Sequence, residues 1–165
     1  MTGVVAGIVA SVKSAVSTPT NLVLNPSFTT NADGWYLGGG LNYRDTSVYR
    51  SAPASLFAQA NGEFYQLQTS YSRTNVLTIG QRYSMSIWIR SSGGIPLNIQ
   101  FLCGTTESTI TETVPSGVFT NYKIENVLCS GNTNLYVNVY DNYSETGFGW
   151  VDDVSVVQGA TALVL

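Results

Sequence analysis

Short runs of alternating apolar and polar residues are the feature that most restricts the fold of this chain. The run 82–90 is the clearest, because every second residue on one side is apolar: Tyr83, Met85, Ile87 and Ile89. Successive side chains of an extended chain point to opposite sides, so this period of two predicts a β-strand with one buried face. The runs 97–103 and 134–140 alternate in the same way.

Runs of this kind fill the chain from residue 21 to residue 157, with turn sequences such as NADG, SSGG and VPSG between them. The predicted strands are 21–24, 35–37, 54–59, 63–69, 82–90, 97–103, 109–114, 120–127, 134–140 and 149–157. Short strands at this spacing, with no helical pattern after residue 18, predict an all-β fold, either an antiparallel sandwich or a barrel. The 165 residues fit one such domain over 19–158, with a short segment at each end.

The N-terminal segment 1–18 has two interpretations. Its apolar residues recur at helical spacing: Val5, Ile8, Val9, Val12 and Val16. This spacing, with a stop at Thr18-Pro19, favours a short helix that needs a surface to pack on. A secretory leader is the alternative, because Ala15-Val16-Ser17 suits a cleavage site. The only cation of the segment, Lys13, follows the apolar stretch, however, whereas a leader carries its positive charge before it.

The C-terminal tail 159–165 ends in ATALVL and is apolar apart from one threonine. It is either the last strand of the sheet or a strand offered to another copy through edge pairing. Only 10% of the residues are charged, so electrostatic repulsion between copies is weak and self-association is possible.

Cys103 and Cys129 are the only cysteines, and each ends a predicted strand. We expect a disulfide if these strands are neighbours, which would close a loop of about 27 residues and add roughly 3–4 kcal/mol to the stability. Two buried free thiols are the alternative. Asn142-Tyr143-Ser144 is a glycosylation sequon in a turn-like stretch, which agrees, as a disulfide would, with an extracellular protein.

The composition excludes several functional classes. The chain has no histidine, which excludes histidine-containing catalytic triads and His-ligated zinc. Seven Lys and Arg residues form no basic stripe, so nucleic acid is not an expected partner. No run of 18 apolar residues occurs, so we expect no transmembrane span.

The polar faces of three predicted strands carry aromatic, amide and guanidinium groups. The candidate ligand-binding residues are Trp88, Arg90, Asn98, Gln100, Tyr136, Asn138 and Tyr140. The C–H faces of sugar rings stack on Trp and Tyr, and sugar hydroxyls pair with amide and guanidinium groups. Such a face therefore predicts glycan binding, while a solvated face of ordinary cross-strand pairs is the alternative. The outward tryptophan Trp88 favours binding.

The acidic residues form no catalytic pair. Glycoside hydrolysis needs two carboxylates roughly 5–10 Å apart, and most of the ten acidic residues lie in turns or in a Thr-rich stretch. We therefore expect a protein that is not an enzyme. Asp152 stands apart, because it alternates with Val154 and Val156 and so should face the core. A carboxylate there must be held by a structural Ca²⁺ or by nearby backbone N–H groups.

Four short motifs follow one another along the chain: NLVLNPSF at 21–28, GW at 34–35, GQRYSMSIWIR at 80–90 and VDDV at 151–154. With these motifs in this order, residues 21–157 resemble the carbohydrate-binding modules of families 4, 9 and 22. The resemblance implies a galactose-binding-like jelly roll of two sheets and a glycan on the concave sheet, with Trp88 and Arg90 on that face. It also implies a structural calcium near the termini. In such modules an acidic residue usually follows the phenylalanine and can contribute to the calcium site, whereas this chain has Thr29 there.

Two functional hypotheses follow. The first is a free-standing secreted module that binds a cell-wall or matrix polysaccharide through the aromatic and amide face. The second is an extracellular structural subunit on the same fold, a homopolymer in which the apolar ends dock onto neighbouring copies and build a filament. The resemblance favours the first hypothesis, and the low charge and apolar ends favour the second.

Overall fold

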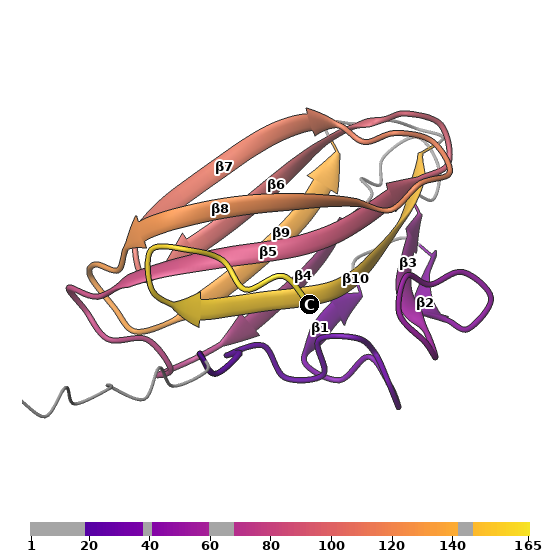
Figure 1. The fold of residues 1–165 in the computed structure, drawn as a ribbon. Helices are drawn as coiled ribbons and strands as arrows, with labels where there is room; N and C mark the ends of the chain where they lie inside the picture. The colour runs from indigo at the N-terminus through magenta and orange to yellow at the C-terminus, as the bar shows by residue number, and fades with distance from the viewer. Residues whose placement is uncertain (1–18, 38–40, 60–67, 142–146) are drawn as a thin grey trace, which may run out of the picture.

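The protein is a sandwich of two antiparallel five-stranded sheets (Figure 1). The computed structural model describes residues 19–37, 41–59, 68–141 and 147–165. The segment 1–18, with its expected helix or leader, and the sequon at Asn142 lie outside these residues. None of the described residues forms a helix that is long and apolar enough to cross a membrane.

Ten strands make up the two sheets. They are β1 (Trp35–Leu37), β2 (Leu41–Asp45), β3 (Ser55–Gln59), β4 (Gln68–Arg73), β5 (Arg82–Ser91), β6 (Pro96–Cys103), β7 (Thr106–Thr113), β8 (Thr120–Leu128), β9 (Leu135–Asp141) and β10 (Phe148–Gln158). Sheet 1 has the order β1-β4-β9-β6-β7, and sheet 2 has the order β2-β3-β10-β5-β8. From β4 onward the chain passes repeatedly between the sheets, which is the jelly-roll arrangement, so the predicted fold class is confirmed.

The core lies between the two sheets and is built by the apolar faces that the alternation predicts. Ile87 and Ile89 of β5 in sheet 2, and Ile99 and Phe101 of β6 in sheet 1, belong to this core, and all four side chains are buried. Because the inner faces are aliphatic and aromatic, the polar side chains of the same strands are left on the two outer faces of the sandwich.

The segment 21–24 is not the expected strand. Its first residue, Asn21, instead binds β10 with its side chain: Nδ2 donates to the carbonyl of Val154 (3.0 Å), and Oδ1 accepts from the N–H of Val156 (2.9 Å). The Asn21 side chain and a backbone hydrogen bond from the N–H of Leu22 to the carbonyl of Val156 (2.8 Å) thus attach this segment to β10 without a strand ladder. The additional strand is β2, whose LNYRD sequence lacks a simple apolar alternation.

The C-terminal tail folds back over the outer face of sheet 2 of its own chain (Figure 1). The carbonyls of Gly159 and Leu163 accept hydrogen bonds from the hydroxyls of Ser84 and Ser155, and the N–H of Ala162 donates to Glu125 Oε1 (2.8 Å). The tail is therefore neither a strand of the sheet nor extended away from the domain, which gives the filament hypothesis no support.

Cys103 and Cys129 are free, buried thiols, so the expected disulfide is not seen. The two side chains are nonetheless neighbours. Burial, and then a hydrogen bond and charge interaction with Cys129, raise the pKa of the Cys103 thiol. Gly104 follows in a left-handed conformation (φ 71°), where a Cβ would lie 2.0 Å from the carbonyl oxygen of Ser130, so only glycine fits this turn.

Candidate functional site

The structure divides the seven candidate ligand-binding residues between the two outer faces. Asn98 and Gln100 of β6 and the three residues of β9 (Tyr136, Asn138 and Tyr140) lie on the outer face of sheet 1. Trp88 and Arg90 of β5 lie on the outer face of sheet 2. The prediction that all seven side chains lie on one surface is therefore wrong. Alternation identifies the side chains that share a face of one strand, but it does not reveal which sheet the strand joins.

A continuous row of polar side chains crosses sheet 1 from one edge to the other. Cross-strand pairing places Tyr36 of β1 beside Ser70 of β4, then Asn138 of β9, Gln100 of β6 and Thr109 of β7. We call these five residues the amide row. All five strands contribute one residue each, so the row is fixed by the register of the whole sheet.

Hydrogen bonds order the middle of the amide row. Asn138 Nδ2 donates to Gln100 Oε1, and Gln100 Nε2 donates to Glu107 Oε1 (2.6 Å). The Thr109 hydroxyl donates to the same carboxylate oxygen (3.1 Å). An amide group has two N–H donors and two acceptor lone pairs, so both amides keep hydrogen-bonding capacity for a ligand while their orientation is fixed.

Tyrosines border the amide row. Tyr136 and Tyr140 stand two residues before and after Asn138 on β9, and both are half-buried. Tyr140 pairs with Asn98, whose side-chain oxygen accepts a hydrogen bond from the Thr111 hydroxyl (2.6 Å). The rings and hydroxyls of Tyr136 and Tyr140 offer both the apolar and the polar contacts that a sugar ring requires.

Several residues of this face, Tyr36 and Glu107 among them, were not among the sequence candidates. Tyr36 is 60% exposed and ends the amide row on β1. Its position could have been found, because the preceding residue Trp35 is apolar and buried, which turns Tyr36 outward. Glu107 lies on the edge strand β7 and was classed with a Thr-rich stretch, since only the β6–β7 register places it beside Gln100.

Arginines cover the two outward tryptophans of sheet 2. The Arg50 guanidinium lies 4.0 Å from the centre of the Trp88 ring, and the Arg90 guanidinium lies 4.9 Å from that of Trp150. The Trp88 Nε1 and Arg90 Nε atoms are buried and have no hydrogen-bond partner among the described residues. The Trp88 face that Arg50 covers is thus not open to a sugar ring.

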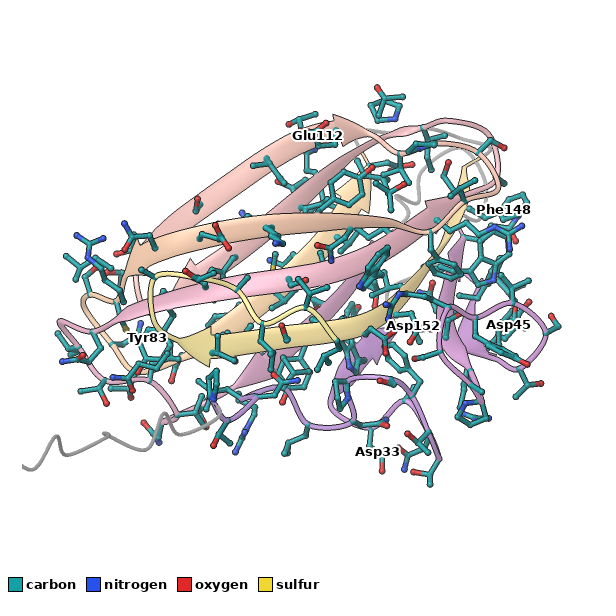
Figure 2. All side chains as sticks on the ribbon, viewed as in Figure 1. Asp33, Asp45, Tyr83, Glu112, Phe148 and Asp152 are labelled. Atoms are coloured by element: carbon teal, nitrogen blue, oxygen red, sulfur yellow. The ribbon has the colours of Figure 1, made fainter. Side chains whose placement is uncertain are left out.

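An aromatic cluster follows on the same outer face of sheet 2. Tyr43, Phe57, Phe148 and Trp150 contact one another with ring-centre distances of 4.7–5.7 Å. Trp150 Nε1 donates to Asp45 Oδ2 (2.8 Å), and Phe148 and Asp45 lie at the same end of the molecule (Figure 2). The four rings pack against one another over the outer side of β2, β3 and β10.

A β-bulge in β10 changes the direction of the predicted metal ligand, Asp152. The register with β5 shifts between Asp152 and Ser155, so Asp152 pairs with Trp88 on the outer side of sheet 2 while Val154 and Val156 face the core. The expectation that Asp152 faces the core is therefore wrong. The segment connecting β2 and β3 binds Asp152, which is fully buried.

Backbone N–H groups hold the Asp152 carboxylate. Oδ2 accepts from the N–H groups of Arg50 (2.9 Å) and Ser51 (3.1 Å), and Oδ1 accepts from the N–H of Asp153 (2.8 Å). Burial raises the pKa of Asp152 to about 6, with a further rise from the neighbouring Asp153 charge and an opposing effect of the backbone hydrogen bonds.

Around Asp152 and Asp153, β10 meets the β2–β3 connection and the segment 27–29. The residues at this junction do not fit a calcium ion. Calcium takes six to eight oxygen ligands, whereas both oxygens of Asp152 already accept N–H groups. The Asp153 carboxylate is paired with Arg50, and the carbonyls of Phe28 and Thr29 accept N–H groups from Arg44. No group of three or more potential metal-ligating side chains occurs among the described residues.

A hollow in the described part of the structure lies elsewhere. It has a volume of about 930 Å³ and is bordered by the segment 19–22, the loop 76–83 and the end of β10. None of the predicted ligand-binding residues lines it, so it is not the site that the sequence indicated.

No family model and no curated protein matches the sequence. Among solved structures, a family 61 carbohydrate-binding module in complex with β-1,4-galactotriose matches with a TM-score of 0.68 and 16% identity, covering 85% of this chain and 99% of that one. A family 16 carbohydrate-binding module gives 0.65 and 12%, with 83% and 99% covered. A xylan-binding domain of family 22 gives 0.63 and 14%, with 84% and 95% covered. This chain has the two-sheet jelly-roll fold of carbohydrate-binding modules.

Proposed function

We propose that the protein is a non-catalytic module that binds a polysaccharide across the outer face of sheet 1. The observation that carries the proposal is the amide row, in which Asn138 and Gln100 are oriented by hydrogen bonds in the middle of a face bordered by tyrosines. Amides at fixed positions can pair with two neighbouring hydroxyls of one sugar, and tyrosine rings can stack on its C–H face.

The charge of this face favours a neutral glycan. Glu107 is the charged side chain that contacts the amide row, and the cations Arg50, Arg90 and Lys123 belong to the other side of the sandwich. Glu107 has no ion-pair partner among the described residues, so a uronic acid polymer would meet an unbalanced carboxylate, which disfavours binding.

The fold comparisons support the same class of ligand. Structures of this fold include a module in complex with β-1,4-galactotriose and two xylan-binding domains. We therefore propose a cell-wall or matrix polysaccharide as the ligand and an extracellular location for the protein.

Catalysis is not part of the proposal. Glycoside hydrolysis needs two carboxylates about 5–10 Å apart on either side of a bound sugar. Of the described residues on the amide row and beside it, only Glu107 carries a carboxylate, and it is engaged by Gln100 and Thr109.

Affinity gel electrophoresis tests the proposal. The full chain is run through native gels that contain xylan, β-1,4-galactan, a β-glucan or polygalacturonate, with serum albumin as a non-binding standard. We expect retardation by at least one of the three neutral polymers and not by polygalacturonate. Equal mobility in all gels, or retardation by polygalacturonate alone, would contradict the proposal.

A further inference from the structure

The buried carboxylate of Asp153 joins three distant segments of the chain. Asp153 sits in the bulge of β10 with a left-handed backbone (φ 45°) and is 2% exposed. Oδ1 accepts hydrogen bonds from the hydroxyls of Ser27 (2.6 Å) and Ser51 (2.5 Å). Oδ2 pairs with the guanidinium of Arg50. The segment that contains Ser27 and the β2–β3 connection are thus both bound to β10 through the Asp153 carboxylate.

Arg50 is held from two sides. Its guanidinium contacts the Asp153 carboxylate and lies over the ring of Trp88 on β5 at 4.0 Å, and its side chain is 30% exposed. A planar guanidinium can form an ion pair in its plane and stack on an indole with its face at the same time, which a lysine ammonium cannot do.

The backbone around Arg50 is fixed as well. The N–H groups of Arg50 and Ser51 both donate to Asp152, which neighbours Asp153 on β10. A second arginine, Arg44, donates from Nε to the carbonyl of Phe28 (2.5 Å) and from Nη2 to that of Thr29 (2.8 Å). Both carboxylates of β10 at this junction and the two carbonyls that Arg44 binds therefore already accept hydrogen bonds from nitrogen or hydroxyl donors.

We infer that the Arg50 guanidinium supplies the positive charge at this junction, in the place where the resemblance to carbohydrate-binding modules implies a calcium ion. The domain is then stable without calcium, and its stability depends on Arg50. The sequence agrees with this inference. Thr29 stands where the modules usually have an acidic residue, and Arg50 neutralises the nearby carboxylate of Asp153. This inference is independent of the proposed glycan site.

Thermal unfolding of the full chain with CaCl₂ and with EDTA tests the calcium half of the inference. A site with a Kd of about 10 µM would raise the Tm by roughly 7 °C or more at about 5 mM calcium. We expect the same Tm in both solutions, and no calcium in the dialysed protein by atomic emission. A calcium-dependent rise of several degrees, or one retained calcium per chain, would overturn the inference.

Arg50 variants test the other half. Arg50→Met keeps the apolar stem but leaves the buried Asp153 charge unpaired, so we expect a Tm lower by roughly 6–20 °C. Arg90→Met is the matched control, since Arg90 also stacks on a tryptophan but forms no ion pair among the described residues, and its loss should be smaller. An Arg50→Met protein that melts with wild type, or with the control, contradicts the role of Arg50.

A double variant keeps the test decisive if Arg50→Met folds poorly. Arg50→Met/Asp153→Asn removes both charges, so the penalty of an unpaired buried carboxylate disappears. We expect the double variant to be more stable than Arg50→Met alone. A double variant that is equally or less stable shows that the two residues are not coupled, and the inference fails.

Discussion

Asn138 of β9 and Gln100 of β6 lie directly opposite each other in sheet 1, and the Asn138 amide donates a hydrogen bond to the Gln100 side-chain oxygen. Gln100 continues this chain of bonds to Glu107 on the edge strand. The two amides therefore present fixed groups at the centre of an outer face instead of freely rotating side chains.

Replacing either central amide should weaken glycan binding without affecting folding. Asn138→Ala and Gln100→Ala each remove ligand hydrogen bonds worth about 1.5 kcal/mol, which corresponds to roughly tenfold weaker binding. Asn121→Ala is the matched control, because Asn121 is an amide on the outer face of sheet 2, bonded to Ser86 (2.7 Å). Titration calorimetry with the retained polysaccharide measures the effect. Equal loss in the control, or no loss in either variant, would count against the amide row.

Tyr36→Ala should reduce affinity while leaving the stability within about 0.5 kcal/mol of wild type. Tyr36 is largely exposed, so its removal creates no cavity, but it takes away a ring on which a sugar can stack. Urea unfolding and titration calorimetry, measured on the same preparation, separate the two effects. If affinity is unchanged, the ligand does not reach β1.

The stability should rise on mild acidification through Asp152. Its pKa in the folded protein, about 6, is above the value for an unfolded chain, about 3.9. The contribution of this group is then complete below pH 4 and is lost as the pH rises through 6. Between pH 7.5 and pH 5 we expect a gain of about 1 kcal/mol in the free energy of unfolding.

Asp152→Asn provides the control for this pH dependence. The variant cannot titrate, so its pH profile should be flatter than that of wild type over the same interval. Asp45 does not interfere, because burial is outweighed there by hydrogen bonds from Ser47, Trp150 and Val48, which lower its pKa and move its contribution below about pH 4. Parallel profiles for wild type and variant would assign the pH dependence to other groups.

The two thiols should be unreactive in the native protein. Cys103 and Cys129 are buried, and the raised pKa of Cys103 keeps it protonated at neutral pH. A disulfide reagent such as Ellman's reagent should label neither cysteine under native conditions and both in guanidinium chloride. Rapid native labelling would contradict the burial, and absence of labelling in denaturant would reveal the disulfide that the sequence suggested.

Much of the fold could be predicted from the sequence, because burial imposes a period of two. The strands β5, β6 and β9 were found through Ile87, Ile99, Val137 and their neighbours, all of which face the core. β2 was missed because its apolar contacts are with the aromatic cluster outside sheet 2, so its sequence shows no core-facing alternation.

The candidate site could be predicted only in part. The residue types were found, but their grouping depends on which sheet each strand joins, and no local pattern contains that information. Trp88 was grouped with Gln100 although the core separates β5 from β6. Asp152 was assigned to the core because a single bulge residue, which reverses the alternation after it, cannot be seen in the spacing of VDDV.

Mapping of amide chemical shifts by NMR during titration with an oligosaccharide of the retained polymer tests the central claim most directly. The amide row predicts that the largest shifts occur on the neighbouring strands β6 and β9 of sheet 1, at residues 98–102 and 136–140. Smaller shifts are expected at Tyr36, at the margin of the row. Shifts centred on Trp88 and Arg90 of β5 would place the ligand on the opposite side of the sandwich and contradict the account.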